Sequence, residues 1–159
     1  LQCNIKSLLI NNYNNNDFNL NQINIATTIF TKTGFKQIII SDIKTLNQTG
    51  LLSIKPKIYG IQPHYLILQN GDLQRGRPID ETRNPDYGKM TQSGLKLTFV
   101  AGDDMAINEK QYETFDGFIK KWINVFPGGE VFGDYELDNR YKGPNFNVKE
   151  RINRNFCIL

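Results

Sequence analysis

Apolar residues in the middle of the chain fall into short runs that predict β-strands. Residues 37–40 read Gln-Ile-Ile-Ile, a β-branched run typical of a strand buried on both faces. Residues 64–68 predict a second strand, and residues 73–76 predict the strand that returns beside it. The Asn70-Gly71 pair between these two runs is a strong signal for a hairpin turn.

A helical period replaces the strand pattern further along the chain. Residues 95–100 still alternate as a strand does, but from residue 112 to 126 large apolar side chains recur every three or four positions. This spacing predicts an amphipathic helix with one buried face. Asn108 is the expected N-cap, and Gln111 completes a capping box with it. The Pro-Gly-Gly sequence at 127–129 ends the helix.

The last part of the chain predicts three further segments. Residues 131–132 indicate a brief strand, residues 134–147 a polar loop, and residues 147–156 a terminal helix. Strands interleaved with helices around one sheet define the α/β class. We therefore predict a single α/β domain with a central mixed β-sheet flanked by helices.

The first part of the chain differs in composition from the rest. Asparagines gather between residues 11 and 24, where they favour turns. Apolar runs at residues 5–10 and 23–30 flank or overlap this region and indicate an N-terminal extension that folds. We divide the chain into an ordered extension (1–35), a main domain (36–150) and a C-terminal tail that packs on the domain or on a neighbour (151–159).

Composition and charge narrow the possible partners. The chain has 159 residues, of which 39% are hydrophobic and 22% charged, as in an ordinary globular domain. No apolar run approaches the roughly 20 residues that a membrane span needs. The net charge is +3, and the basic residues are scattered rather than grouped, so we expect no nucleic-acid partner. This mild charge permits contact with an acidic polymer such as the cell wall but does not identify one.

The cysteines and the first residue carry less information. Cys3 and Cys157 lie near opposite ends of the chain, and they either form one bridge or remain buried thiols. We favour thiols, because two isolated cysteines do not make a disulfide framework. The chain begins with Leu1 instead of methionine, which we expect of a processed product, a fragment or a renumbered piece of a longer chain. It shows no signal-peptide pattern.

The segment 64–81 resembles the hairpin of the N-acetylmuramoyl-L-alanine amidases, a family that includes the phage lysozyme-type amidases and the peptidoglycan recognition proteins. It reads His-Tyr-Leu-Ile-Leu-Gln-Asn-Gly-Asp-Leu-Gln-Arg-Gly-Arg-Pro-Ile-Asp-Glu, and the family pattern has a His, an aromatic, aliphatic residues, a Gly turn, Gly-Arg-Pro and acidic residues. Later segments follow the family's order, so that the likeness spans about residues 36–150. These segments are 95–102, 108–127, 131–138 and 143–148.

The resemblance implies a zinc site, because the family holds zinc with three side chains and leaves a fourth position for water. The zinc-bound hydroxide attacks the amide between N-acetylmuramic acid and L-alanine. At the three ligand positions this chain has Ser41 and Asp134 in place of two histidines, and Gly143 in place of a Cys, Asp or His. In addition, Pro63 stands where the phage enzymes carry a catalytic Tyr.

The chain's own residue types also argue against zinc. A catalytic zinc site favours His and Cys ligands, but the chain has one His, and its cysteines lie outside the resembling region. A substitute site of His64, Asp42 and Asp134 is disfavoured, because carboxylate-rich sites suit harder ions. We therefore expect no catalytic residue, no metal and no other cofactor.

A groove for glycan is a separate possibility. His64 is either a remnant of substrate recognition or a hydrogen-bonded strand residue, and we favour the second. Arg75 and Arg77 either bind a carboxylate or are solvated, and the sequence leaves both open. Tyr141 stands where some family members use a Lys, and Lys142 lies one place further on. The candidate groove residues are His64, Arg75, Arg77, Tyr141 and Lys142.

The expected function follows from a fold without its catalytic side chains. We expect a catalytically inactive amidase-like domain that serves as a structural or binding component. The resemblance suggests a phage virion, in its tail or baseplate, with other virion or assembly proteins as partners. Two alternatives stay open: an active peptidoglycan amidase with an altered metal site, and a module that binds the cell wall.

Overall fold

The computed structural model describes most of the main domain, and the rest of the chain falls outside the described residues. The described ranges are 37–44, 63–76, 94–102, 104–125, 128–139 and 141–156. The predicted N-terminal extension and both cysteines lie outside them, as do Arg77 and residues 157–159 of the predicted tail. The elements are β1 (Gln37–Asp42), β2 (Tyr65–Ile67), β3 (Leu73–Arg75), β4 (Leu95–Phe99), α4 (Glu109–Val125), β5 (Glu130–Gly133), α5 (Asp134–Leu137) and α6 (Val148–Phe156).

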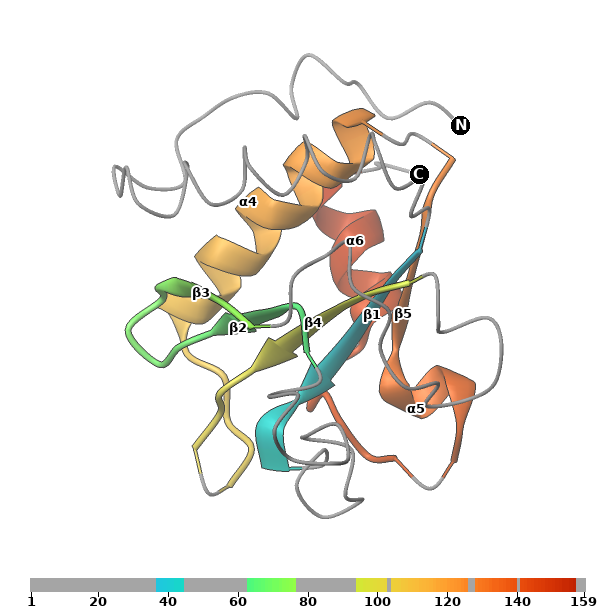
Figure 1. The fold of residues 1–159 in the computed structure, drawn as a ribbon. Coiled ribbons are helices and arrows are strands. Elements are labelled where there is room, and N and C mark those ends of the chain that lie inside the picture. The colour runs from blue at the N-terminus through green and yellow to red at the C-terminus, as the bar shows by residue number, and fades with distance from the viewer. Residues whose placement is uncertain are drawn as a thin grey trace.

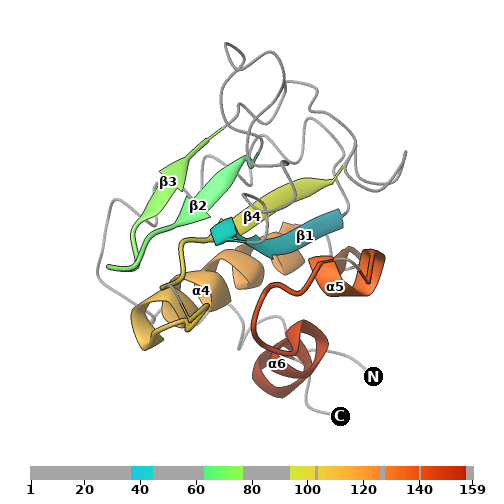
Figure 2. The ribbon, with the colours of Figure 1, turned by 90° about the horizontal axis from the view of Figure 1, so that it is seen from below.

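The strands form one mixed sheet. Its order is β3-β2-β4-β1-β5, with β2, β4, β1 and β5 parallel and β3 antiparallel to β2. Helices α4 and α6 lie on the same side of this sheet (Figures 1 and 2). Among the described residues, no helix is long and apolar enough to cross a membrane. The predicted single α/β domain with a mixed sheet is confirmed.

The hydrophobic core lies between the sheet and the two long helices. Every second residue of a strand points to the same face, so β1 contributes Ile38 and Ile40 to this side. The predicted helical stripe meets them with fully buried side chains, among them Phe115 and Trp122. Burying a large apolar side chain stabilises a fold by roughly 1.5–3 kcal/mol. This layer is therefore the main source of stability for the described part of the domain.

The N-terminus of α4 is joined to the sheet through one buried glutamine. The predicted capping box is present, since the Gln111 N–H donates to Asn108 Oδ1 at 3.0 Å and the Asn108 N–H donates to Gln111 Oε1 at 3.2 Å. The same Gln111 side chain donates from Nε2 to the carbonyls of Ile67 and Val100, at 3.2 and 3.0 Å. Gln111 thus caps the helix and holds it against the ends of two neighbouring strands.

The hairpin between β2 and β3 is the predicted one. Gly71 has a φ of +90°, a left-handed conformation that glycine adopts without strain. Its N–H donates to the Leu68 carbonyl at 2.8 Å, and the Leu68 N–H donates to the Asp72 carbonyl at 2.8 Å. A Cβ at Gly71 would lie 3.0 Å from the Lys110 carbonyl oxygen, so glycine also lets the first turn of α4 approach the hairpin.

One element departs from the prediction. Residues 134–147 were expected to form a loop, but Asp134–Leu137 form the short helix α5. The Glu136 carboxylate accepts the Gly133 N–H at 2.6 Å, which stabilises the start of this turn. The Tyr135 hydroxyl accepts the Val148 N–H at 3.0 Å and ties α5 to the start of α6. A single helical turn is too short to show a hydrophobic period, so residues 134–137 carry no periodic signal.

We expect Gln111→Leu to lower the free energy of unfolding by about 2 kcal/mol or more. The substitution keeps the volume of the side chain but removes its bond to the Asn108 N–H and leaves the Ile67 and Val100 carbonyls without this partner, at roughly 1–3 kcal/mol for a carbonyl that is shielded from water. Urea denaturation measures the change. Glu113→Gln on the exposed face of α4 is the matched control and should change stability by less than about 0.5 kcal/mol. Equal effects of the two variants would contradict the role of Gln111.

Candidate functional site

The face of the sheet that points away from α4 and α6 carries polar side chains. Because side chains alternate along a strand, Ser41 of β1 points away from the core residues Ile38 and Ile40. Lys96 and Thr98 of β4 alternate in the same way with the core residues of that strand. All three polar side chains are 0% exposed. Buried polar groups require partners, and each pairing defines part of the site.

Ser41 and Thr98 are partners of each other. They face each other in the register of β1 and β4, and their hydroxyl oxygens lie 2.7 Å apart. One hydroxyl donates to the other, which satisfies part of the hydrogen-bonding capacity of both. Ser41, the residue at the first implied zinc position, is therefore engaged within the sheet.

Lys96 and Asp134 form a buried ion pair. Lys96 Nζ lies 3.6 Å from Asp134 Oδ1, and both side chains are 0% exposed. β1 separates β4 from β5, and Asp134 directly follows β5, so the lysine side chain must extend across β1 to reach it. Lys and Asp are almost never fully buried unless they are paired. The pair thus connects β4 to the start of α5, two segments that are not neighbours in the sheet.

The backbone brings the three implied zinc positions to one place, which we call the β1/β5 corner (Ser41, Asp134 and Gly143). Ile40 of β1 pairs in the parallel register with Gly133, the last residue of β5, so Ser41 and Asp134 each directly follow one residue of this pair. The Gly143 carbonyl accepts the N–H of Tyr135, the neighbour of Asp134, at 3.2 Å.

The side chains at this corner do not suit zinc. They comprise a hydroxyl bonded to Thr98, a carboxylate paired with an ammonium group, and a hydrogen atom at Gly143. Zinc in proteins takes sulfur, imidazole nitrogen and carboxylate oxygen, usually from three or four side chains. Within the described ranges, no group of three or more His, Cys, Asp or Glu residues could hold a metal ion.

His64 takes part in the pairing of β2 and β4. The side chain is buried, and its Nδ1 accepts the backbone N–H of Lys96 at 3.0 Å. The backbone N–H of His64 donates to the Lys96 carbonyl at 3.1 Å. An Nδ1 that accepts carries no proton, so the neutral ring is protonated at Nε2. His64 directly precedes β2, and both hydrogen bonds join it to the backbone of Lys96 in β4.

The other candidate groove residues are spread across the sheet. Arg75 is exposed on the edge strand β3, and Arg77 lies outside the described residues. Lys142 is exposed, whereas Tyr141 is buried and donates its N–H to the Asp138 carbonyl at 3.1 Å. Tyr141 and Lys142 come after α5 in the chain, and α5 follows β5, the edge strand opposite β3. Neighbouring strands are about 4.8 Å apart, so Arg75 is roughly 19 Å from the β5 edge.

Sequence reasoning did not single out Lys96. It occupies a polar position of an alternating strand, which ordinarily faces solvent, and its partner Asp134 is distant in sequence. A usable signal was present, however. Leu95 and Leu97 flank it in a strand that the amidase-like order places inside the sheet, where both faces are covered.

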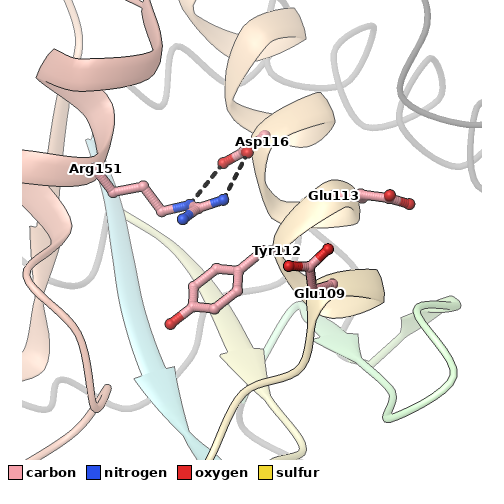
Figure 3. A pocket seen from close by; sticks show the side chains of 5 residues that line it. All are labelled: Glu109, Tyr112, Glu113, Asp116 and Arg151. Carbon is pink, nitrogen blue, oxygen red and sulfur yellow. Dashed lines mark hydrogen bonds and ion pairs between the residues drawn. The ribbon is translucent and has the colours of Figure 1, made fainter.

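A second polar cluster lies on the opposite side of the domain, between α4 and α6 (Figure 3). Arg151 donates to both carboxylate oxygens of Asp116, at 3.0 and 2.9 Å, and its guanidinium carbon lies 4.0 Å from the centre of the Tyr112 ring. Burial raises the pKa of the Tyr112 hydroxyl, and Arg151 partly opposes this rise. An open hollow of roughly 300 Å³ is lined by these residues with Glu109 and Glu113. The contacts join the two helices.

Solved structures similar to this chain include a recognition protein and an amidase. The first is the crystal structure of tracheal cytotoxin bound to the ectodomain complex of peptidoglycan recognition proteins LCa and LCx, with a TM-score of 0.55 and 14% identity over 76% of this chain and 81% of that chain. The second is the N-acetylmuramoyl-L-alanine amidase LysC from Clostridium intestinale URNW, with a TM-score of 0.57 and 14% identity over 75% of this chain and 83% of that chain.

These similarities show the fold. No protein-family model matches the chain, and no curated protein matches it. At 14% identity, the structural likeness defines a single α/β domain of the amidase and peptidoglycan recognition type. The resemblance inferred from the hairpin and the segments after it is therefore confirmed at the level of the fold.

We expect Lys96→Met to destabilise the domain by about 3–5 kcal/mol, because it leaves the Asp134 carboxylate buried without its ammonium partner. The double variant Lys96→Met/Asp134→Leu removes both charges and should regain most of that loss. Urea denaturation of the wild type, both single variants and the double variant gives the coupling energy of the pair. Additive losses in the double variant would show that the two residues do not stabilise each other.

Proposed function

We propose that this chain is a non-catalytic amidase-like domain that serves as a structural or binding component of a phage virion, in its tail or baseplate. The observation that supports the loss of catalysis is the chemistry of the β1/β5 corner. Asp134 is the one side chain there that zinc commonly accepts, and it already faces the Lys96 ammonium. A hydrolytic zinc site needs three protein ligands and an open position for water.

The structural role is supported by what the chain retains. The hydrophobic core between the sheet and α4 is complete in the described residues, and Gln111 and the hairpin still join α4 to the sheet. A fold that keeps its packing while its metal corner is replaced is retained for its shape or surface. The virion setting comes from the resemblance to phage lysozyme-type amidases, and the partners would be other virion or assembly proteins.

A second candidate is a module that binds peptidoglycan without cleaving it. The similarity to recognition proteins, one of which was solved with tracheal cytotoxin bound, favours this function. The exposed Arg75 offers a guanidinium group for a carboxylate of such a ligand.

Incubation of the purified chain with bacterial peptidoglycan and added Zn²⁺ should release no new L-alanine amino termini. The physical reason is that the β1/β5 corner lacks the ligands that hold a zinc-bound hydroxide. An amine-reactive reagent measures the release, and the LysC amidase serves as the positive control. Release that stops on chelation and is lost in Asp134→Ala would establish an active amidase instead.

Sedimentation with insoluble peptidoglycan separates the structural role from the binding role. For the structural role, we expect the chain to stay in the supernatant at physiological ionic strength, because the candidate groove residues are dispersed. The measurement is the pelleted fraction of wild type and of Arg75→Ala. Saturable pelleting of the wild type that Arg75→Ala weakens would instead identify a cell-wall binding module.

A further inference from the structure

The Lys96 side chain brings its ammonium group into the β1/β5 corner. It is among the largest fully buried side chains of the described residues, and its Nζ lies 3.6 Å from the Asp134 carboxylate. The opposite charges of an ammonium group and a carboxylate attract each other strongly where water is excluded. The corner therefore contains one acid and one cation of its own.

The strand register explains how the cation reaches this place. Lys96 pairs with Ile39 of β1, and Ile39 pairs on its other side with Phe132 of β5. The backbone of Lys96 thus lies in β4, next to β1, and its side chain ends beside Asp134, the residue that follows β5. Arriving at Asp134 from across β1, the ammonium group lies on the side of the sheet that also carries Ser41.

A divalent metal at Asp134 would meet this charge at close range. A zinc ion binds a carboxylate oxygen at about 2.0–2.2 Å, which would leave it within roughly 6 Å of the ammonium. Like charges at that separation repel strongly where water is excluded. Ser41 provides no compensation, because its hydroxyl is engaged by Thr98 at 2.7 Å.

We propose that Lys96 is the resident cation of the β1/β5 corner and bars a divalent metal from Asp134. This inference rests on the proposed loss of catalysis and gives it a physical cause beyond the missing ligands. It follows that new ligands alone do not create a metal site here. Lys96 must also be replaced by an uncharged residue.

Two variants that differ only at Lys96 test the proposal. The first, Ser41→His/Gly143→Cys, supplies an imidazole and a thiolate beside Asp134 and retains Lys96. Gly143 does not have a positive φ, so a side chain there causes no strain in the backbone conformation. The second adds Lys96→Met. Competition with a chromophoric chelator gives the Zn²⁺ affinity of each full chain, and the absorption bands of Co²⁺ report tetrahedral coordination.

We expect the variant with Lys96→Met to bind one Zn²⁺ at least about 100-fold more tightly than the variant that retains Lys96. Equal affinities, or stoichiometric Zn²⁺ binding by the wild type that Asp134→Ala abolishes, would overturn the proposal. If the Lys96→Met variant is unfolded without metal, refolding driven by Zn²⁺, followed by circular dichroism, reports the same binding. A variant that neither binds Zn²⁺ nor refolds with it also counts against the proposal.

The outcomes of this experiment and of the peptidoglycan assay can be told apart. Hydrolysis by the wild-type chain that persists in Asp134→Ala would refute the non-catalytic function alone, whereas metal-dependent hydrolysis that Asp134→Ala abolishes would refute both proposals. Equal affinities would refute the role of Lys96. The missing ligands would then be the sole physical cause of the proposed loss of catalysis.

Discussion

The ion pair between Lys96 and Asp134 joins parts of the domain that backbone hydrogen bonds do not join. β4 and β5 are separated by β1, and α5 follows β5, so the pair is a side-chain link across the sheet. Its net contribution to stability is modest, because desolvation of both charges offsets their attraction. Its contribution to specificity is larger, since any arrangement that separates the two groups leaves a charge buried alone.

The two faces of the sheet therefore depend on different forces. Toward α4 and α6, stability comes from apolar packing, which tolerates substitutions of similar volume. On the opposite face, a hydrogen bond joins Ser41 and Thr98 and an ion pair joins Lys96 and Asp134, so a change in one member of a pair penalises the other. The core lies on one face of the sheet, while the buried polar residues of the other face require polar partners.

Most of the fold could be predicted because its signals are local. The Asn70-Gly71 turn, the capping box of Asn108 with Gln111, and the stripe of α4 each lie within one short window of sequence, and the structure confirms them. The single turn of α5 was missed because it has no period to detect. The hydrogen bonds from Gln111 to two strands could not be predicted from the sequence either, because they depend on the order of the strands.

The candidate site also combines residues that the sequence could indicate with one that depends on the order of the strands. Ser41, Asp134 and Gly143 were placed through a resemblance that follows the order of motifs, and the register of β1 with β5 brings them together. Lys96 could not be found in this way, because a family pattern records the positions that normally act and not a new residue that reaches them from another strand. A long charged side chain on a neighbouring strand can therefore belong to such a site. The buried Asp134 carboxylate is costly without a cation beside it, and lysine can supply that cation from β4 because its four-carbon stem crosses one strand.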